Sequence, residues 1–257
     1  MKSGMRNIMT DRDELYQIAQ TIAHKPLLRG LRDKVAPRHT AIIVVDMQND
    51  FVAKDGMMGK EGWNLTLAQE MAERLPGLLA AARRAGVLVV FVHNIYSTGT
   101  NHYLSDVWME QAARKRPGGY ITIPGCEATS WGADYYANLR PEVNDPVVVK
   151  HRYNAFLNTD LDTILRANGI RTTVFTGVST NCCVESTARE AFMRDYYVVV
   201  VDDATASYSR ELHQAALKTL DALFGEITSI AALTEIWNRT NNAPPDDVCS
   251  GEFGVPI

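Results

Sequence analysis

The chain has 257 residues, 46% of them hydrophobic and 22% charged, a composition typical of a globular protein and unlike that of a disordered or fibrous chain. It carries 26 Lys and Arg against 30 Asp and Glu, a formal net charge of −4, and no basic stretch interleaved with aromatic residues, which argues against a nucleic-acid partner. The longest apolar runs stop well short of the roughly 18 residues of a membrane span, so we expect no membrane partner. The first residues lack the apolar segment of a secretory signal, and we therefore expect a cytoplasmic protein.

The pattern of apolar, polar and turn-forming residues divides the chain into three parts. Residues 1–38 form an N-terminal helical arm, in which apolar residues recur at roughly helical spacing between positions 15 and 31. Residues 39–240 form the main domain, in which an irregular insertion over residues 96–145, rich in Gly, Pro and aromatic residues, is expected to cover the site. Residues 241–257 contain few helix formers and are expected to form an extended tail.

Apolar, β-branched runs alternate with helical patterns along the main domain. Buried strands are predicted at residues 41–45, 87–92, 147–149, 172–176 and 197–201, with a short last strand at 226–228. Helices are predicted at residues 65–84, 160–167, 181–194 and 211–223, and a last helix ends near residue 237. This alternation predicts an α/β fold with a doubly wound, mostly parallel six-stranded sheet and helices on both faces, a Rossmann-like three-layer arrangement.

Chemically useful side chains fall where these predicted strands end. Asp46 and Lys150 each close an apolar strand, and the turn that begins at Gly177 leads into the helix that carries Cys183. Ligand sites of such sheets lie at the carboxyl ends of the strands, so these groups should converge. Each one alone is also explained as a sheet-end cap, a plain ion pair or a small core thiol. Together they supply a base, a cation and a nucleophile, and the helix start is expected to lower the pKa of the thiol.

The remaining cysteines are less informative. The adjacent Cys182 and Cys183 do not have the spacing of a disulfide framework in a chain of this size, so we expect reduced thiols. Cys126 and Cys249 lie in loop-like segments without a flanking base, and we interpret both as inert thiols.

Three segments occur in a specific order within about residues 40–238: AIIVVDMQNDF, KHRYNAFLNTDLDTILRANGIRTTVFTG and TGVSTNCCVESTAREAFMRDYYVVVVDDATAS. They resemble the isochorismatase-like cysteine hydrolases. By this resemblance Asp46 is the general base, Lys150 is the cation beside it and Cys183 is the nucleophile. The resemblance also implies a cis peptide bond between Val178 and Ser179, and an oxyanion hole formed by the backbone N–H groups of Ser179 and Cys183.

The resemblance favours one branch of this family. Members that hydrolyse the vinyl ether of isochorismate can dispense with the cysteine, whereas amidases need it to form a thioester, so Asp46, Lys150 and Cys183 together favour amide hydrolysis. Nicotinamidases add a metal site, but the stretch after the second strand lacks the acid and the paired histidines of that site. His93 and His102 do not have ligand spacing either, and we predict no metal and no cofactor.

Within the amidase branch, the sequence is most similar to the enzymes that hydrolyse ureidoacrylate in pyrimidine breakdown. These have an Asn-x-aromatic pair after the second strand, which is Asn94 and Tyr96 here. An Asn side chain donates to and accepts from a ureido group, and an aromatic ring stacks on its plane. We therefore predict a metal-independent cysteine amidohydrolase that cleaves a C–N bond in a small linear amide or ureide. The residues expected to contact the substrate are Asn94, Tyr96, Gln48, Phe51, Arg152 and Tyr153.

Other interpretations stay open on the sequence. Biuret, triuret, N-carbamoyl amino acids and maleamate are neighbouring substrate classes, and an isochorismate-type vinyl ether hydrolase would need no thiol. A catalytically silent interaction module that keeps the fold is a further alternative. We also expect a homo-oligomer, a dimer or tetramer, because the apolar stripe of residues 15–31 needs a surface to bury it.

Overall fold

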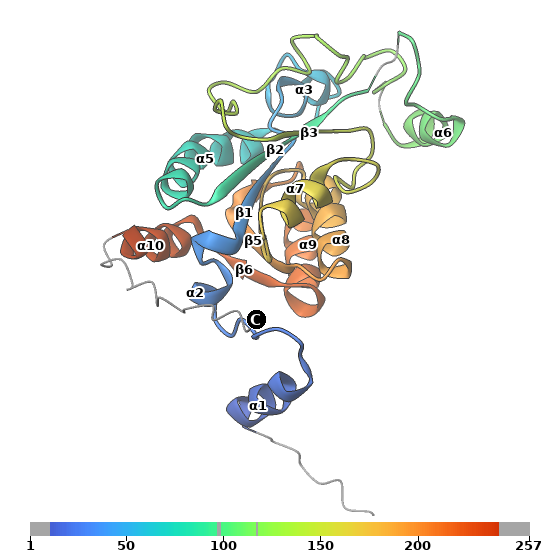
Figure 1. Ribbon diagram of the computed structural model, residues 1–257. Coiled ribbons are helices and arrows are strands. Elements are labelled where there is room, and N and C mark those ends of the chain that lie inside the picture. The colour runs from blue at the N-terminus through green and yellow to red at the C-terminus, as the bar shows by residue number, and fades with distance from the viewer. Residues whose placement is uncertain (1–10, 97–98, 117, 242–257) are drawn as a thin grey trace, which may run out of the picture.

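The computed structural model describes residues 11–96, 99–116 and 118–241, which form an α/β fold around one six-stranded sheet (Figure 1). The strand order is β3-β2-β1-β4-β5-β6, and every pairing is parallel. The strands are β1 Thr40–Val45, β2 Leu88–Asn94, β3 Val147–Lys150, β4 Thr172–Val178, β5 Tyr197–Ala206 and β6 Glu226–Thr228. The predicted doubly wound sheet is therefore confirmed, and the strand order reverses between β1 and β4, where such sheets bind their ligands.

The central strand β1 is buried on both faces. Because side chains alternate along a strand, Ile42 and Val44 join the core on one face of the sheet, and Ala41, Ile43 and Val45 join the core on the other. This double burial explains the continuous apolar run that predicted the strand.

The edge strand β3 differs from the prediction of a buried strand. Val147 and Val149 are 42% and 46% exposed, whereas Val148 and Lys150 are buried. Valine suits a pleated surface on either face, so an all-valine run does not distinguish an edge strand from a central one. The alternation turns Lys150 inward, toward the end of the sheet where β1 also stops.

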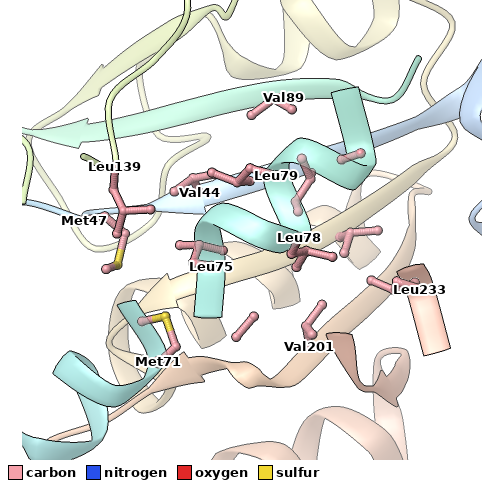
Figure 2. Close-up of a cluster of buried hydrophobic side chains, with 14 of the residues drawn as sticks. Val44, Met47, Met71, Leu75, Leu78, Leu79, Val89, Leu139, Val201 and Leu233 are labelled. Carbon is pink, nitrogen blue, oxygen red and sulfur yellow. The ribbon is translucent and has the colours of Figure 1, made fainter. Parts of the chain in front are cut away.

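Helices cover both faces of the sheet (Figure 1). The helix α5 and the last helix α10 pack on one face, and α7, α8 and α9 pack on the other. Figure 2 shows the first core, in which Leu75, Leu78 and Leu79 of α5 face Val44 and Val89 of the sheet. The bounds are α5 Thr66–Arg84, α7 Leu161–Ala167, α8 Glu185–Met193, α9 Arg210–Leu223 and α10 Ile230–Asn241.

The insertion over residues 96–145 is more regular than predicted, because it contains the helix α6, Asp106–Lys115. This helix begins at Ser105, whose side chain accepts a hydrogen bond from the backbone N–H of Trp108 at 3.3 Å. Two short helices, α3 Asn49–Val52 and α4 Met57–Lys60, lie between β1 and α5. The insertion and α4 share a separate small hydrophobic core. It includes Met57 and Met58 of α4 and Leu104, Tyr120 and Cys126 of the insertion.

The N-terminal arm contains the helix α1, Arg12–Ile22, which extends away from the body of the protein in Figure 1. Its apolar residues Leu15, Ile18 and Ile22 are half exposed or more. The arm continues through the short helices α2 Leu31–Lys34 and η1 Pro37–His39 into β1. Nearly all of the predicted tail, and Cys249 with it, lies outside the described residues. Within the described part of the chain, no helix combines the length and the apolar character needed to cross a membrane.

Candidate active site

Asp46 and Lys150 meet at the carboxyl end of the sheet. Asp46 follows β1 directly and Lys150 is the last residue of β3, two strands away. The Asp46 Oδ2 and Lys150 Nζ atoms lie 2.9 Å apart, and both side chains are almost completely buried. Asp46 has a backbone φ of 51°, a left-handed conformation that is uncommon for a residue other than glycine and that often accompanies a functional position.

Cys183 lies on the π-helical turn η2, Thr180–Val184, which joins β4 to α8. The Lys150 Nζ is 3.4 Å from the Cys183 Sγ, and it also donates hydrogen bonds to the Asn94 Oδ1 at 3.1 Å and the Arg152 carbonyl at 3.0 Å. A single buried ammonium group thus contacts both the carboxylate of Asp46 and the thiol of Cys183. The structure brings together the three residues that the sequence singled out for chemistry.

The backbone before Cys183 requires glycine at position 177. Gly177 has a φ of 99°, and a Cβ atom there would lie 2.1 Å from the Val45 carbonyl oxygen of the neighbouring strand. The next peptide bond but one, between Val178 and Ser179, is cis. The backbone N–H of Ser179 donates no hydrogen bond to another described residue.

Burial and the neighbouring side chains shift the pKa values of all three groups. Burial raises the pKa of Asp46, while Lys150 acts in the opposite direction. Burial works against the charge of Lys150, but Asp46 and Cys183 outweigh it and raise the pKa of this ammonium group. The Cys182 side chain and burial raise the pKa of the Cys183 thiol well above its usual range, against the opposing effect of Lys150. This direction is opposite to the expectation that the helix start lowers the pKa of the thiol, because the Cys182 side chain and burial both favour the neutral form.

A cavity of about 330 Å³ opens over these groups. Asp46, Cys183 and Ser179 line it, and so do four of the six residues that the sequence predicted to contact the substrate: Phe51, Asn94, Tyr96 and Tyr153. Tyr96 and Asn94 are each only 1% exposed, although they border the cavity.

Gln48 and Arg152 do not line this cavity. The Gln48 side chain donates to the carbonyls of Asn94 and Ala133 at 2.9 and 2.8 Å and accepts from the Asn94 backbone N–H at 2.8 Å. The Arg152 guanidinium donates to the carbonyls of Tyr103 and His151 at 2.8 and 2.6 Å. Gln48 therefore holds the backbone that carries Asn94, and Arg152 stabilises loop carbonyls.

Several lining residues were not found from the sequence. Lys115 and Arg116 follow one another at the end of α6, and Trp63 and Tyr208 come from two further loops. Lys and Arg at a helix C-terminus are common for electrostatic reasons alone, so nothing in the sequence marked this pair. The aromatic content of the insertion was the one available signal.

The histidines are not arranged as metal ligands. Among the described residues, no group of three or more His, Cys, Asp and Glu side chains is placed to hold a metal ion. His93 packs edge-on against the Tyr135 ring, with 5.0 Å between ring centroids. Cys126, Cys182 and Cys183 are free thiols, and Cys126 is fully buried.

The fold and the site define a class of protein: a doubly wound α/β domain with a carboxylate, a lysine and a cysteine at the switch point of a parallel sheet. The family model of the isochorismatase domain matches residues 40–232. The chain belongs to the isochorismatase family of hydrolases, as its motifs indicated.

Relatives and solved structures agree with this assignment. The chain is 38% identical over 209 residues to the ureidoacrylate amidohydrolase RutB of Stutzerimonas stutzeri, which covers 76% of this chain and 82% of that protein. It is 35% identical over 206 residues to the protein of the same name from an Enterobacter species, with 76% and 88% covered.

Two solved structures have the same fold. A cysteine hydrolase from Pseudomonas syringae superposes with a TM-score of 0.69 at 27% identity, covering 85% of this chain and all of that one. The N-carbamoylsarcosine amidase of Thermoplasma acidophilum superposes with a TM-score of 0.59, also at 27% identity, covering 75% and 96%.

Proposed function

We propose that the protein is a metal-independent cysteine amidohydrolase that cleaves a C–N bond of a small linear amide or ureide through a thioester. The observation that carries the proposal is the position of the Lys150 Nζ, 2.9 Å from the Asp46 carboxylate and 3.4 Å from the Cys183 sulfur. A carboxylate, an ammonium group and a thiol in contact supply the base, the charge stabilisation and the nucleophile of acyl transfer.

In the first half-reaction Asp46 takes the proton of Cys183, and the sulfur attacks the carbonyl carbon to form a tetrahedral oxyanion. The raised pKa of the thiol makes a base necessary, because little thiolate exists before substrate binds. The backbone N–H groups of Ser179 and Cys183 donate to the oxyanion, and Lys150 stabilises the negative charge of the attacking sulfur. The C–N bond then breaks, and the proton held by Asp46 passes to the leaving nitrogen.

In the second half-reaction water cleaves the thioester. Asp46 removes a proton from the water, the hydroxyl oxygen bonds to the carbonyl carbon, and the C–S bond breaks. The proton returns to the Cys183 sulfur, so the residues end as they began and the net reaction is the addition of one water across the C–N bond.

Asn94 and Tyr96 are proposed to hold the amide or ureido head of the substrate. The Asn94 Oδ1 accepts from Lys150, while the buried Nδ2 finds no acceptor of good geometry among the described residues and has only the weakly accepting Cys126 sulfur beside it. A buried donor without a partner costs free energy, and a substrate carbonyl oxygen would satisfy it. Phe51 and Tyr153 supply apolar walls of the same cavity.

The names of the relatives support a ureidoacrylate-like substrate for this chain. Such a substrate would give the protein a place in pyrimidine degradation. The test is a screen for release of ammonia from ureidoacrylate, biuret, triuret, N-carbamoyl amino acids, maleamate and nicotinamide. Cys183→Ala and Cys183→Ser should abolish turnover, and mass spectrometry of the wild type during turnover should show the acylated Cys183. Undiminished turnover by Cys183→Ala would refute the thioester mechanism.

The homo-oligomer stays a prediction. It now rests on α1, in which none of the residues is buried although Leu15, Ile18 and Ile22 lie at helical spacing. Light scattering of the full chain should show a dimer or tetramer, and deletion of residues 1–35 should weaken it. A monomer that the deletion leaves unchanged would contradict this expectation.

A further inference from the structure

The cavity has an unbalanced positive charge at some distance from the reacting groups. The ionised side chains that line it are Asp46, Lys115 and Arg116. Asp46 is paired with Lys150, and Arg116 is paired with the fully buried carboxylate of Glu61. Lys115 pairs with none of the described carboxylates, so the charged groups of the cavity sum to one excess cation.

Arg116 is held rigidly in the cavity wall. Its guanidinium donates to both carboxylate oxygens of Glu61 at 2.8 to 3.1 Å, and its Cζ lies 4.6 Å from the centroid of the Tyr120 ring. Glu61 is fixed in turn by the Trp63 indole N–H, which donates to it at 2.8 Å. A buried ion pair of this kind contributes little stability over an apolar replacement, so its position next to a cavity favours a binding role.

The positive charge of Arg116 acts on the turn η2, which carries Cys182 and Cys183. The Cys183 side chain is the main cause that lowers the pKa of Cys182, and Arg116 contributes in the same direction. Burial raises the pKa of Tyr153, which also lines the cavity, to about 12. This phenol therefore stays protonated at neutral pH and remains a hydrogen-bond donor.

We propose that Lys115 and Arg116 form an anion-binding subsite, so that the preferred substrate is an amide or ureide that carries a carboxylate group. The inference rests on the proposed amidohydrolase function and narrows it. The carboxylate lies at the α6 end of the cavity, where Lys115 supplies the uncompensated charge and Arg116 supplies directed N–H donors. Carboxylate-bearing ureides are thereby favoured over biuret, triuret and nicotinamide, which are neutral.

The first experiment compares two ureides that differ in one carboxylate, 3-ureidopropionate and propylurea. The wild type should hydrolyse 3-ureidopropionate with a kcat/KM at least about tenfold higher, the order expected for one close charge pair in a partly solvated site. Lys115→Gln should remove most of this preference, mainly through a higher KM for 3-ureidopropionate. Equal use of both ureides by the wild type, or an unchanged preference in Lys115→Gln, would overturn the subsite.

The matched control is Arg114→Gln, which removes one positive charge from the same helix turn. Arg114 pairs with Glu110 on the exposed side of α6 and does not line the cavity. It should leave the preference unchanged, so an equal effect of both variants would assign the preference to the general field of the helix and refute a subsite. Lys115 is itself exposed, and its replacement removes no buried contact.

A second experiment keeps the subsite testable if neither ureide is hydrolysed. Iodoacetate and iodoacetamide alkylate the same thiol and differ in a carboxylate, and tandem mass spectrometry assigns the modified sulfur to Cys183 or Cys182. The ratio of the iodoacetate rate to the iodoacetamide rate at Cys183 should fall about three- to tenfold in Lys115→Gln and stay unchanged in Arg114→Gln. The double variant Glu61→Gln, Arg116→Gln, which removes both partners of the buried ion pair together, should lower the ratio as well.

These arms separate the two proposals. Absence of hydrolysis of every amide and ureide in the screen, with the expected alkylation ratios, would refute the proposed activity and keep the anion subsite. Hydrolysis of both ureides with ratios that no variant changes would keep the amidohydrolase and refute the subsite.

Discussion

Asn94 and Lys150 are register partners at the ends of the neighbouring parallel strands β2 and β3, and the Lys150 ammonium donates to the Asn94 Oδ1 at 3.1 Å. This contact fixes the orientation of the Asn94 amide, since an ammonium group can only donate and must face the oxygen. The amide nitrogen then lies beside the buried Cys126 sulfur and has no acceptor of good geometry among the described residues. The group proposed to stabilise the reacting sulfur therefore also orients the group proposed to recognise the substrate.

Replacement of Asn94 by alanine should weaken catalysis without unfolding the protein. The loss of a buried hydrogen bond to the substrate head is expected to cost about 1 to 3 kcal/mol in transition-state binding, measured as the decrease in kcat/KM on the best ureide. Asn144→Ala, at an exposed position that does not line the cavity, is the control. A decrease of less than twofold for Asn94→Ala would place recognition on other residues of the cavity, such as Tyr153.

Removing one partner of the Asp46–Lys150 ion pair should lower the free energy of unfolding more than removing both charges. Lys150→Met leaves a buried carboxylate without its partner and should lower the free energy of unfolding by about 3 to 5 kcal/mol. The double variant Asp46→Asn, Lys150→Met removes both charges with a residue that tolerates the left-handed φ of 51°, and it should recover part of this loss while it stays inactive. Urea unfolding gives the comparison, and a double variant no more stable than Lys150→Met would contradict the expectation.

The pH dependence of activity follows from the same pair. Asp46 must be ionised to accept the thiol proton, and burial raises its pKa above the ordinary aspartate value, so kcat/KM should fall as the pH is lowered through this raised pKa. The acid limb should therefore lie above the range of an exposed aspartate. Asp46→Asn should remove the activity over the whole pH range, because an amide cannot accept the proton. A pH profile with its acid limb at the ordinary aspartate value would argue that another group limits the reaction.

Much of this architecture could be predicted from the sequence, because buried parallel strands have a strong local signature. The runs that end at Asp46 and Lys150 and the glycine turn before Cys183 are local features, and the topology of a doubly wound sheet then brings their ends together. The helix α6 was missed because the Gly, Pro and aromatic residues around it dominate the pattern of the insertion.

The finer assignments depend on tertiary contacts that no local pattern encodes. Gln48 belongs to the first motif and was expected to contact the substrate, but its side chain is engaged by the backbone of Asn94 and Ala133. Lys115 and Arg116 are thirty or more residues from any of the motifs, and they reach the cavity only because the insertion folds over it.

Gly177→Ala should destabilise the protein. A Cβ atom at this position would lie 2.1 Å from the Val45 carbonyl oxygen, and the φ of 99° is unfavourable for any side chain. We expect a loss of more than about 1 kcal/mol in the free energy of unfolding, with a larger proportional loss of activity because the turn carries Ser179 and Cys183. The control is Gly77→Ala in the helix α5, where an added Cβ meets no atom within 4 Å and should stabilise the helix by about 0.5 to 1 kcal/mol. Equal stability of Gly177→Ala and the wild type would show that the turn relaxes.

A hydrogen-bonded chain of side chains that ends at η2, the turn that carries Cys183, should also affect the rate of the reaction. The His213 ring lies between Asp202 and Thr180, with its Nε2 3.0 Å from the Asp202 Oδ1 and its Nδ1 2.8 Å from the Thr180 Oγ1. Thr180 is fully buried and directly follows Ser179, so His213 helps to position the backbone that would hold the oxyanion. Small displacements of reacting groups are costly, and His213→Phe should lower kcat by about tenfold while KM changes little.

The control for this network is a substitution of Asp202, the residue at its exposed end. Asp202 is more than half exposed, so Asp202→Asn keeps a hydrogen-bond acceptor for His213 and should lower kcat by less than about threefold. His213→Asn, which keeps a side-chain donor and acceptor near Thr180, should recover part of the activity that His213→Phe loses. If the stability of His213→Phe fell by urea unfolding while kcat stayed at the wild-type value, the network would serve folding alone, and the oxyanion turn would be positioned by η2 and the strand β4 without it.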